Sequence, residues 1–179
     1  MRRSYQTAWL CAAAAMGWLA APSTAAACDP RLSLSFEDAA PRDRLTLVNL
    51  SETPWLATDL QLDLAPSAGA LVLDTAPGGP GTSLSGAVSG ADLSAPPEVS
   101  DGATRLMLTL RDVAPGERSV VLLDLDQSGA AGFAPSVSAA ALKGARAEAT
   151  FRAASGRESV AKGVFGDRGA ALLAPPACV

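Results

Sequence analysis

The sequence predicts an all-β fold, a single antiparallel β-sandwich of about 7–9 strands. Three observations favour it. Apolar and polar residues alternate with a period of two in several short runs, turns rich in Gly and Pro separate these runs, and 179 residues suit one domain better than two. With 49% hydrophobic and 18% charged residues, the chain is too apolar to be disordered.

The alternating runs place every second side chain on a core, as in half-buried strands. They span residues 32–36, 45–47, 60–64 and 106–110. Leu71–Leu73 and Val120–Leu123 are continuously apolar, which predicts strands covered on both faces. Residues 76–100 are rich in Gly and Pro, and we expect a long connection with one short strand near Thr82–Val88. The alternative for this connection is a binding loop.

The stretch from 134 to 155 is ambiguous between helix and strand. Ala139–Lys143 favours a helix by propensity, but Gly144 interrupts it. Polar residues alternate with Ala149 and Phe151 further along, so we predict a strand over Ala145–Arg152. Gly156 then predicts a hairpin turn. The second strand of that hairpin is expected over residues 158–165.

Residues 1–27 are typical of a secretory signal peptide. Arg2 and Arg3 precede an apolar segment, Ala8–Ala21, and Ala25–Ala27 supplies small residues for cleavage. The alternatives are an uncleaved anchor, a twin-arginine signal and a lipidated Cys28. The mature domain is therefore expected over residues 28–179, in a chain exported to the periplasm, the cell surface or the medium.

Two cysteines remain in that mature chain. Two cysteines in an exported protein predict one disulfide, between Cys28 and Cys178, with Cα atoms within about 7 Å. It would hold the first and last strands side by side. The alternative, a reactive thiol pair, would need CxxC spacing and basic neighbours, and neither cysteine has them.

Several classes of function are excluded by composition and motifs. Histidine is absent, which removes Ser–His and Cys–His catalysis and His-ligated metals, and the glycine-rich nucleotide motifs are absent too. The full sequence has 14 basic and 18 acidic residues. Removal of the signal peptide takes away Arg2 and Arg3, so the net charge of the mature chain is near −6. Such a charge disfavours nucleic acid as a partner. No apolar run after the signal reaches membrane-spanning length.

An ordered series of short blocks resembles exported bacterial proteins labelled aggregation factor core protein. The blocks are Asp43–Asn49, Gly69–Thr75 followed by Gly78–Gly81, Asp101–Gly102, Leu106–Leu108, Pro115–Glu117, Leu123–Asp126 and Lys143–Ala145. The resemblance implies an immunoglobulin-like sandwich outside the cell, without enzyme activity. Its label suggests cell adhesion in cell-surface aggregation.

The acidic residues suggest two further chemistries. Asp124 and Asp126 are two residues apart on one predicted strand and so share a face, which makes them weak calcium candidates, with Asp74 and Asp112 as further donors. A solvated strand end is the interpretation we favour for this pair. Paired carboxylates also serve in hydrolases, but such sites use aromatic platforms, and we expect the most prominent aromatic residue, Trp55, to be a core anchor.

The function predicted from the sequence is therefore an extracytoplasmic, non-enzymatic interaction or adhesion module. Its expected partner is a protein or another component of the cell surface, and no cofactor is expected beyond weak calcium. The alternatives are a calcium-dependent binding domain and a hydrolase that uses carboxylates.

Overall fold

The computed structural model describes residues 28–39, 42–76, 88–129 and 137–178. All strand pairs in these ranges are antiparallel, and the helical elements η2 (Ala139–Leu142) and η3 (Pro176–Cys178) are short 3-10 turns. The all-β, antiparallel class is therefore confirmed.

Eleven strands form in the described residues, more than the 7–9 expected. Their bounds are β1 Leu32–Glu37, β2 Asp43–Asn49, β3 Trp55–Asp63, β4 Leu71–Leu73, β5 Ser89–Gly90, β6 Arg105–Val113, β7 Arg118–Leu123, β8 Leu125–Gln127, β9 Arg146–Ala153, β10 Glu158–Val164 and β11 Ala170–Leu173. Two strands that the sequence did not predict, β5 and β8, have only two or three residues each. Segments of that length are too short to show a period in sequence.

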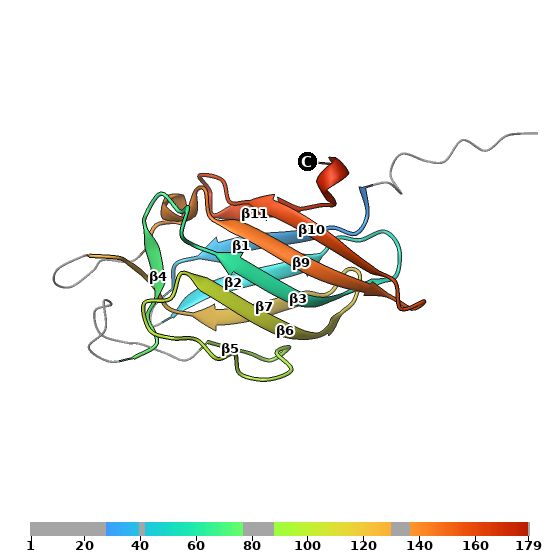
Figure 1. The fold of residues 1–179 in the computed structure, drawn as a ribbon, viewed down its shortest axis with the longest axis horizontal. Helices are drawn as coiled ribbons and strands as arrows, with labels where there is room; N and C mark the ends of the chain where they lie inside the picture. The colour runs from blue at the N-terminus through green and yellow to red at the C-terminus, as the bar shows by residue number, and fades with distance from the viewer. Residues whose placement is uncertain (1–27, 40–41, 77–87, 130–136, 179) are drawn as a thin grey trace, which may run out of the picture.

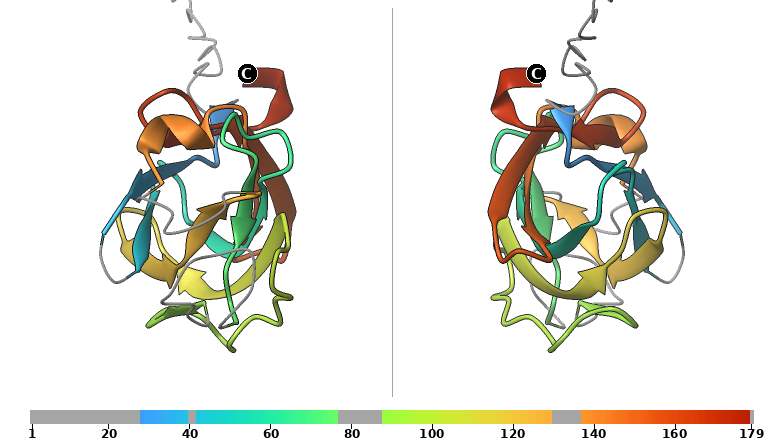
Figure 2. Two further views of the ribbon diagram at one scale, coloured as in Figure 1. Left: turned by 90° about the vertical axis from the view of Figure 1, so that its left-hand side faces the viewer. Right: turned by 90° about the vertical axis from the view of Figure 1, so that its right-hand side faces the viewer.

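The strands form two main sheets and one small one (Figure 1). One sheet has the order β11-β1-β2-β7-β5, the other has the order β10-β9-β3-β6, and β4 pairs with β8. The end views of Figure 2 show the two main sheets as separate layers. Buried leucines from both, including Leu34 and Leu47 of one sheet and Leu60 and Leu108 of the other, form a single hydrophobic core.

The long strands alternate as predicted, with β6 showing buried and exposed residues in turn. All three residues of β4 are buried, in agreement with the expectation. In β7 the expectation of cover on both faces is wrong, since Val120 and Leu122 are only half-buried. The outer side of this strand thus stays partly open to solvent despite its apolar sequence.

The ambiguous stretch contains both elements that the sequence suggested. Residues 139–142 form η2, and the chain then turns at Gly144, where φ is +89° and a Cβ would lie 2.5 Å from the Pro66 carbonyl oxygen. The strand predicted to follow is confirmed as β9, and the hairpin at Gly156 leads into β10. The short strand expected near Thr82–Val88 falls on residues 77–87, outside the described ranges, except for Val88.

Polar contacts hold the two layers together beside the core. Asn49 is fully buried in the first sheet, and its Nδ2 donates to the carbonyl oxygens of Trp55 and Val113 in the second, both at 2.8 Å. Trp55 is buried as predicted, and the Arg157 guanidinium lies 4.8 Å from its ring centroid.

The first and last strands lie side by side in one sheet, next to the edge strand β10 of the other. Strand β1 pairs with β11, with Leu32 opposite Leu173, as expected for the first and last strands. Beyond β11, Lys162 and Ala174 exchange main-chain hydrogen bonds of 2.8 and 3.1 Å and join β10 of the other sheet to this edge. We call this junction of β10 and β11 the seam.

Candidate functional site

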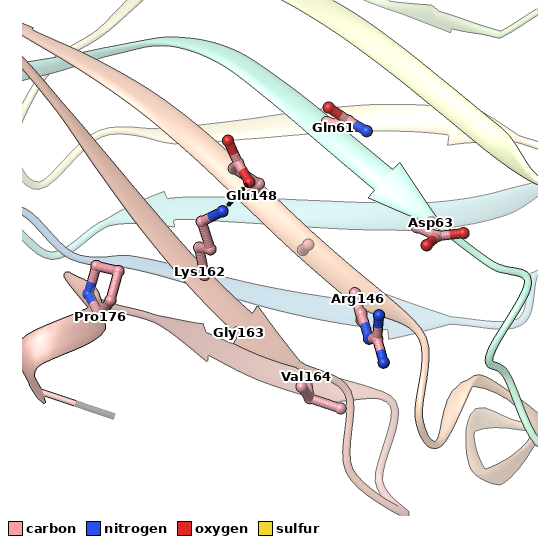
Figure 3. A pocket seen from close by; sticks show the side chains of 9 residues that line it. Gln61, Asp63, Arg146, Glu148, Lys162, Gly163, Val164 and Pro176 are labelled. Atoms are coloured by element: carbon pink, nitrogen blue, oxygen red, sulfur yellow. Dashed lines mark ion pairs between the residues drawn. The ribbon is translucent and has the colours of Figure 1, made fainter.

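The outer face of the β10-β9-β3-β6 sheet carries a hollow of about 480 Å³ (Figure 3). It lies over the C-terminal half of β3, the start of β9 and the end of β10, and Pro176 of η3 stands at its rim. Six side chains that line it carry its chemistry: Gln61, Asp63, Arg146, Glu148, Lys162 and Val164.

Strand register arranges these side chains in two adjoining rows across the sheet. The first row, from β6 to β10, is Arg105, Asp63, Arg146 and Val164. The second row is Met107, Gln61, Glu148 and Lys162. Directly opposite residues of antiparallel strands project to the same face, so both rows point outward. The hollow is thus built from the outward positions of β3, β9 and β10, and β6 extends the two rows beyond it.

Some charged side chains of the two rows form ion pairs and others do not. Lys162 Nζ lies 2.7 Å from Glu148 Oε2; the Lys162 side chain is exposed and that of Glu148 is half-buried. Asp63 accepts the main-chain N–H of Ala65 at 3.2 Å. Arg146 forms no ion pair or hydrogen bond with any residue in the described ranges. Figure 3 shows its guanidinium turned away from the Glu148–Lys162 pair.

A disulfide fixes the turn at the rim of the hollow. Cys28 and Cys178 are bonded with a Cα–Cα distance of 5.5 Å, which confirms the pairing predicted from the sequence. Cys178 belongs to η3, two residues after Pro176. The cross-link and the Lys162–Ala174 hydrogen bonds therefore hold the rim on both sides.

The acidic candidates lie elsewhere, around the small β4-β8 sheet. Asp74 follows β4, Asp124 lies between β7 and β8, and Asp126 lies within β8 opposite Val72. The Asp74 N–H donates to the Asp124 carbonyl oxygen at 3.0 Å, which brings these residues together. Asp126 is 8% exposed, so the expectation of a solvated strand end is wrong for it. Pairing with β4 covers this side chain, and the sequence did not show that pairing.

Burial changes the acidity of this cluster. Burial is the main cause that raises the pKa of Asp74 to about 6, and the carboxylates of Asp126 and Asp101 add to the rise. Burial also raises the pKa of Asp124 to about 6, and the negative charges of Asp126 and Asp74 add to this rise. The Arg42 guanidinium opposes it. The Oδ1 atom of Asp74 has no hydrogen-bond partner among the described residues. These carboxyl groups are therefore costly to ionise.

Asp43, at the start of β2, has the largest shift. Burial raises its pKa to about 7, although its Oδ2 accepts the Leu125 N–H at 3.1 Å. We call Asp43, Asp74, Asp101, Asp124 and Asp126 together the acidic end.

Asp112 does not join the acidic end, contrary to the possibility raised from the sequence. It lies near the end of β6 and pairs with Arg152 of β9 at 2.8 Å, so the length of β6 separates it from the cluster. Across the described part of the chain, no three Asp, Glu, Cys or His side chains are grouped so as to hold a metal ion. Calcium binding by Asp124 and Asp126 stays a hypothesis based on two carboxylates.

Sequence reasoning did not single out the hollow. Its residues occupy the polar positions of strands that were predicted correctly, so an available signal was the run of charged residues at alternate positions of β9 and β10. Arg146 can be placed beside Asp63 and Val164 only when the order of the strands in the sheet is known.

Comparisons with protein-family models, with curated proteins and with solved structures gave no match for this chain. In the residues that the structure describes, no helix is long and apolar enough to cross a membrane.

Proposed function

We propose that this protein is an extracytoplasmic, non-enzymatic interaction domain that contacts its partner through the outer face of the β10-β9-β3-β6 sheet. The observation that carries the proposal is the hollow on that face. It combines charged and hydrogen-bonding side chains with the exposed Val164, a mixture typical of surfaces that bind other molecules.

Export is supported by two independent features. Residues 1–27 have the composition of a signal peptide. Cys28 and Cys178 form a disulfide, and disulfides persist in oxidising compartments outside the cytoplasm. We propose that residues 28–179 form the mature domain, outside the cytoplasm.

For the architecture we propose an immunoglobulin-like sandwich, as the resemblance to aggregation factor core proteins implies. Two antiparallel sheets around one core, with the chain ends on neighbouring strands, support this assignment. The same resemblance favours adhesion at the cell surface as the role of the interaction.

The hydrolase alternative is less well supported by the site. The general acid of such enzymes is a carboxyl group that a dry, apolar pocket keeps protonated. Glu148 faces solvent and is paired with Lys162, and no aromatic side chain is among the described residues that line the hollow. We therefore propose binding without turnover.

The test is photo-crosslinking in the cells that produce the protein. A benzophenone amino acid replaces Val164 in the hollow or, as the control, Ser35 on the exposed face of the other sheet. We expect a discrete adduct from position 164 and none from position 35. No adduct at 164, or equal adducts at both positions, contradicts the proposal, as does hydrolytic turnover that disappears in a Glu148→Gln variant.

A further inference from the structure

Arg146 is the cation of the hollow that forms no ion pair with a described residue, although Asp63 lies opposite it on β3. Lys162 is paired with Glu148 at 2.7 Å, whereas Arg146 has no carboxylate within ion-pairing distance in the described residues. Its side chain is exposed on the β9 strand and lies beside Val164 (Figure 3). The guanidinium is thus positioned to bind a group from outside the chain.

The hollow is less acidic than the chain as a whole, because its lining has two cations, Arg146 and Lys162, and two anions, Asp63 and Glu148. The two rows contain three cationic side chains, Arg105, Arg146 and Lys162, and two anionic ones, Asp63 and Glu148. The full sequence carries 18 acidic and 14 basic residues. Because Glu148 pairs with Lys162, Arg146 is the cation of the lining that has no ion pair within the described residues, and it can attract and orient an anionic group.

Val164, an exposed apolar side chain, lies opposite this cation in the strand register. Val164 is 58% exposed, and Leu172 on β11 is 55% exposed. The two strands approach closely at the seam, where a Cβ on Gly163 would lie 2.5 Å from the Leu172 carbonyl oxygen. A guanidinium next to aliphatic surface suits a ligand that has a carboxylate next to an aliphatic group.

We propose, as an extension of the proposed function, that the hollow binds an extended, acidic segment of a partner protein. A carboxylate of that segment pairs with Arg146, and a neighbouring aliphatic side chain covers Val164. One planar guanidinium matches one carboxylate through two parallel hydrogen bonds, whereas nucleic acids require a series of cations along their backbone.

The position of the hollow favours a peptide over a sugar polymer. Its described lining lacks the aromatic side chains on which sugar rings stack. It lies along β10, the edge strand of its sheet, whose main-chain hydrogen bonds to the segment that follows β11 are those of the Lys162–Ala174 bridge in the described ranges. Edge strands bind extended peptides through main-chain hydrogen bonds and alternate side-chain contacts.

The test uses fluorescein-labelled peptides of about nine residues that alternate Val with Glu, Gln or Lys. Fluorescence anisotropy is measured with the oxidised, exported protein. We expect the Glu peptide to bind, and the Gln and Lys peptides to bind at least about tenfold more weakly, because only a carboxylate pairs with Arg146.

Two matched variants show where the peptide binds. Arg146→Gln is expected to weaken binding of the Glu peptide about tenfold, and Arg146→Lys to weaken it less. Arg118→Gln, which removes an exposed arginine from the other sheet, should leave the affinity unchanged. Equal binding by Arg146→Gln and the unmodified protein would overturn the inference.

The remaining outcomes separate this inference from the proposed function. A discrete crosslink at position 164 without binding of the Glu peptide overturns the peptide assignment alone. Binding of polygalacturonate that depends on Arg146 overturns it in favour of an acidic polysaccharide. Absence of both the crosslink and peptide binding overturns the proposed function as well.

Discussion

The hollow and the acidic end use the same residue types in opposite ways. In the hollow, Glu148 and Lys162 face solvent and pair with each other, and Arg146 stays accessible. At the acidic end, Asp74 and Asp43 are withdrawn from solvent, and burial is the main cause that raises the pKa of each, to about 6 and about 7.

The comparison shows that the role of a charged sequence motif depends on whether its side chains are buried or exposed. The Leu123–Asp126 block suggests a set of calcium ligands, yet burial raises the pKa of Asp124, and Asp126 is buried. The polar residues of β9 and β10 had the appearance of ordinary solvent-facing positions, yet they line the hollow. Burial therefore makes the acidic end a determinant of stability, and exposure makes the hollow a candidate for binding.

The largest expected effect is that of the disulfide beside the hollow. Replacing both Cys28 and Cys178 with Ser should lower the free energy of unfolding by about 4–5 kcal/mol, because the cross-link spans 150 residues of sequence and restricts the unfolded chain. Urea unfolding measures this loss. Because the pH dependence of stability arises at the acidic end and not at the disulfide, the plot of stability against pH should keep its shape in this variant. Equal stability with and without the bond would contradict the prediction.

The second effect concerns the seam, which forms one side of the hollow. Gly163→Ala should cost about 1–3 kcal/mol, because its Cβ would lie 2.5 Å from the main-chain oxygen of Leu172 and force β10 and β11 apart. Gly166→Ala is the control, since its nearest contact would be 3.9 Å away. Thermal melts compare the two variants, and equal melting temperatures would show that the seam tolerates a side chain.

The acidic end should make stability fall as the pH rises. The folded-state pKa values, about 7 for Asp43 and about 6 for Asp74 and Asp124, lie above the ordinary value of 3.8. The folded state therefore retains protons that the unfolded state has lost, and stability decreases from about pH 4 until it levels off above about pH 7.

Asp43→Asn tests this dependence directly. Asparagine still accepts the Leu125 N–H without carrying a charge, so the variant should gain about 1–2 kcal/mol at pH 8 and show a shallower slope. Asp112→Asn is the matched control, because that carboxylate is exposed and paired with Arg152. Urea unfolding at pH 4, 6 and 8 gives the slopes. An unchanged slope in Asp43→Asn would mean that its burial has no energetic consequence.

Calcium should have the smallest effect. A site with two carboxylates and neutral oxygens binds in the range of about 0.1–1 mM at best, so millimolar calcium adds about 1 kcal/mol at most. Micromolar calcium should leave the melting temperature unchanged. A large shift at micromolar calcium that Asp124→Asn abolishes would show that the acidic end is a metal site.

The sequence by itself determined the fold class, most of the strands and the disulfide. Alternation such as that of Leu106, Leu108 and Leu110 needs only the chemistry of consecutive residues, because a strand with one buried face imposes it. The pairing of Cys28 with Cys178 followed from their being the two cysteines of the expected mature chain, and the fold places them 5.5 Å apart between Cα atoms.

Tertiary structure alone decided which residues act together. The hollow exists because β3, β9 and β10 are neighbours, which brings Asp63, Arg146 and Val164 into one row from distant parts of the sequence. The acidic end exists because β4 pairs with β8 and covers Asp126. Strand order, and with it the burial of Asp126, arises from packing over the whole molecule, so no local pattern in the sequence specified it.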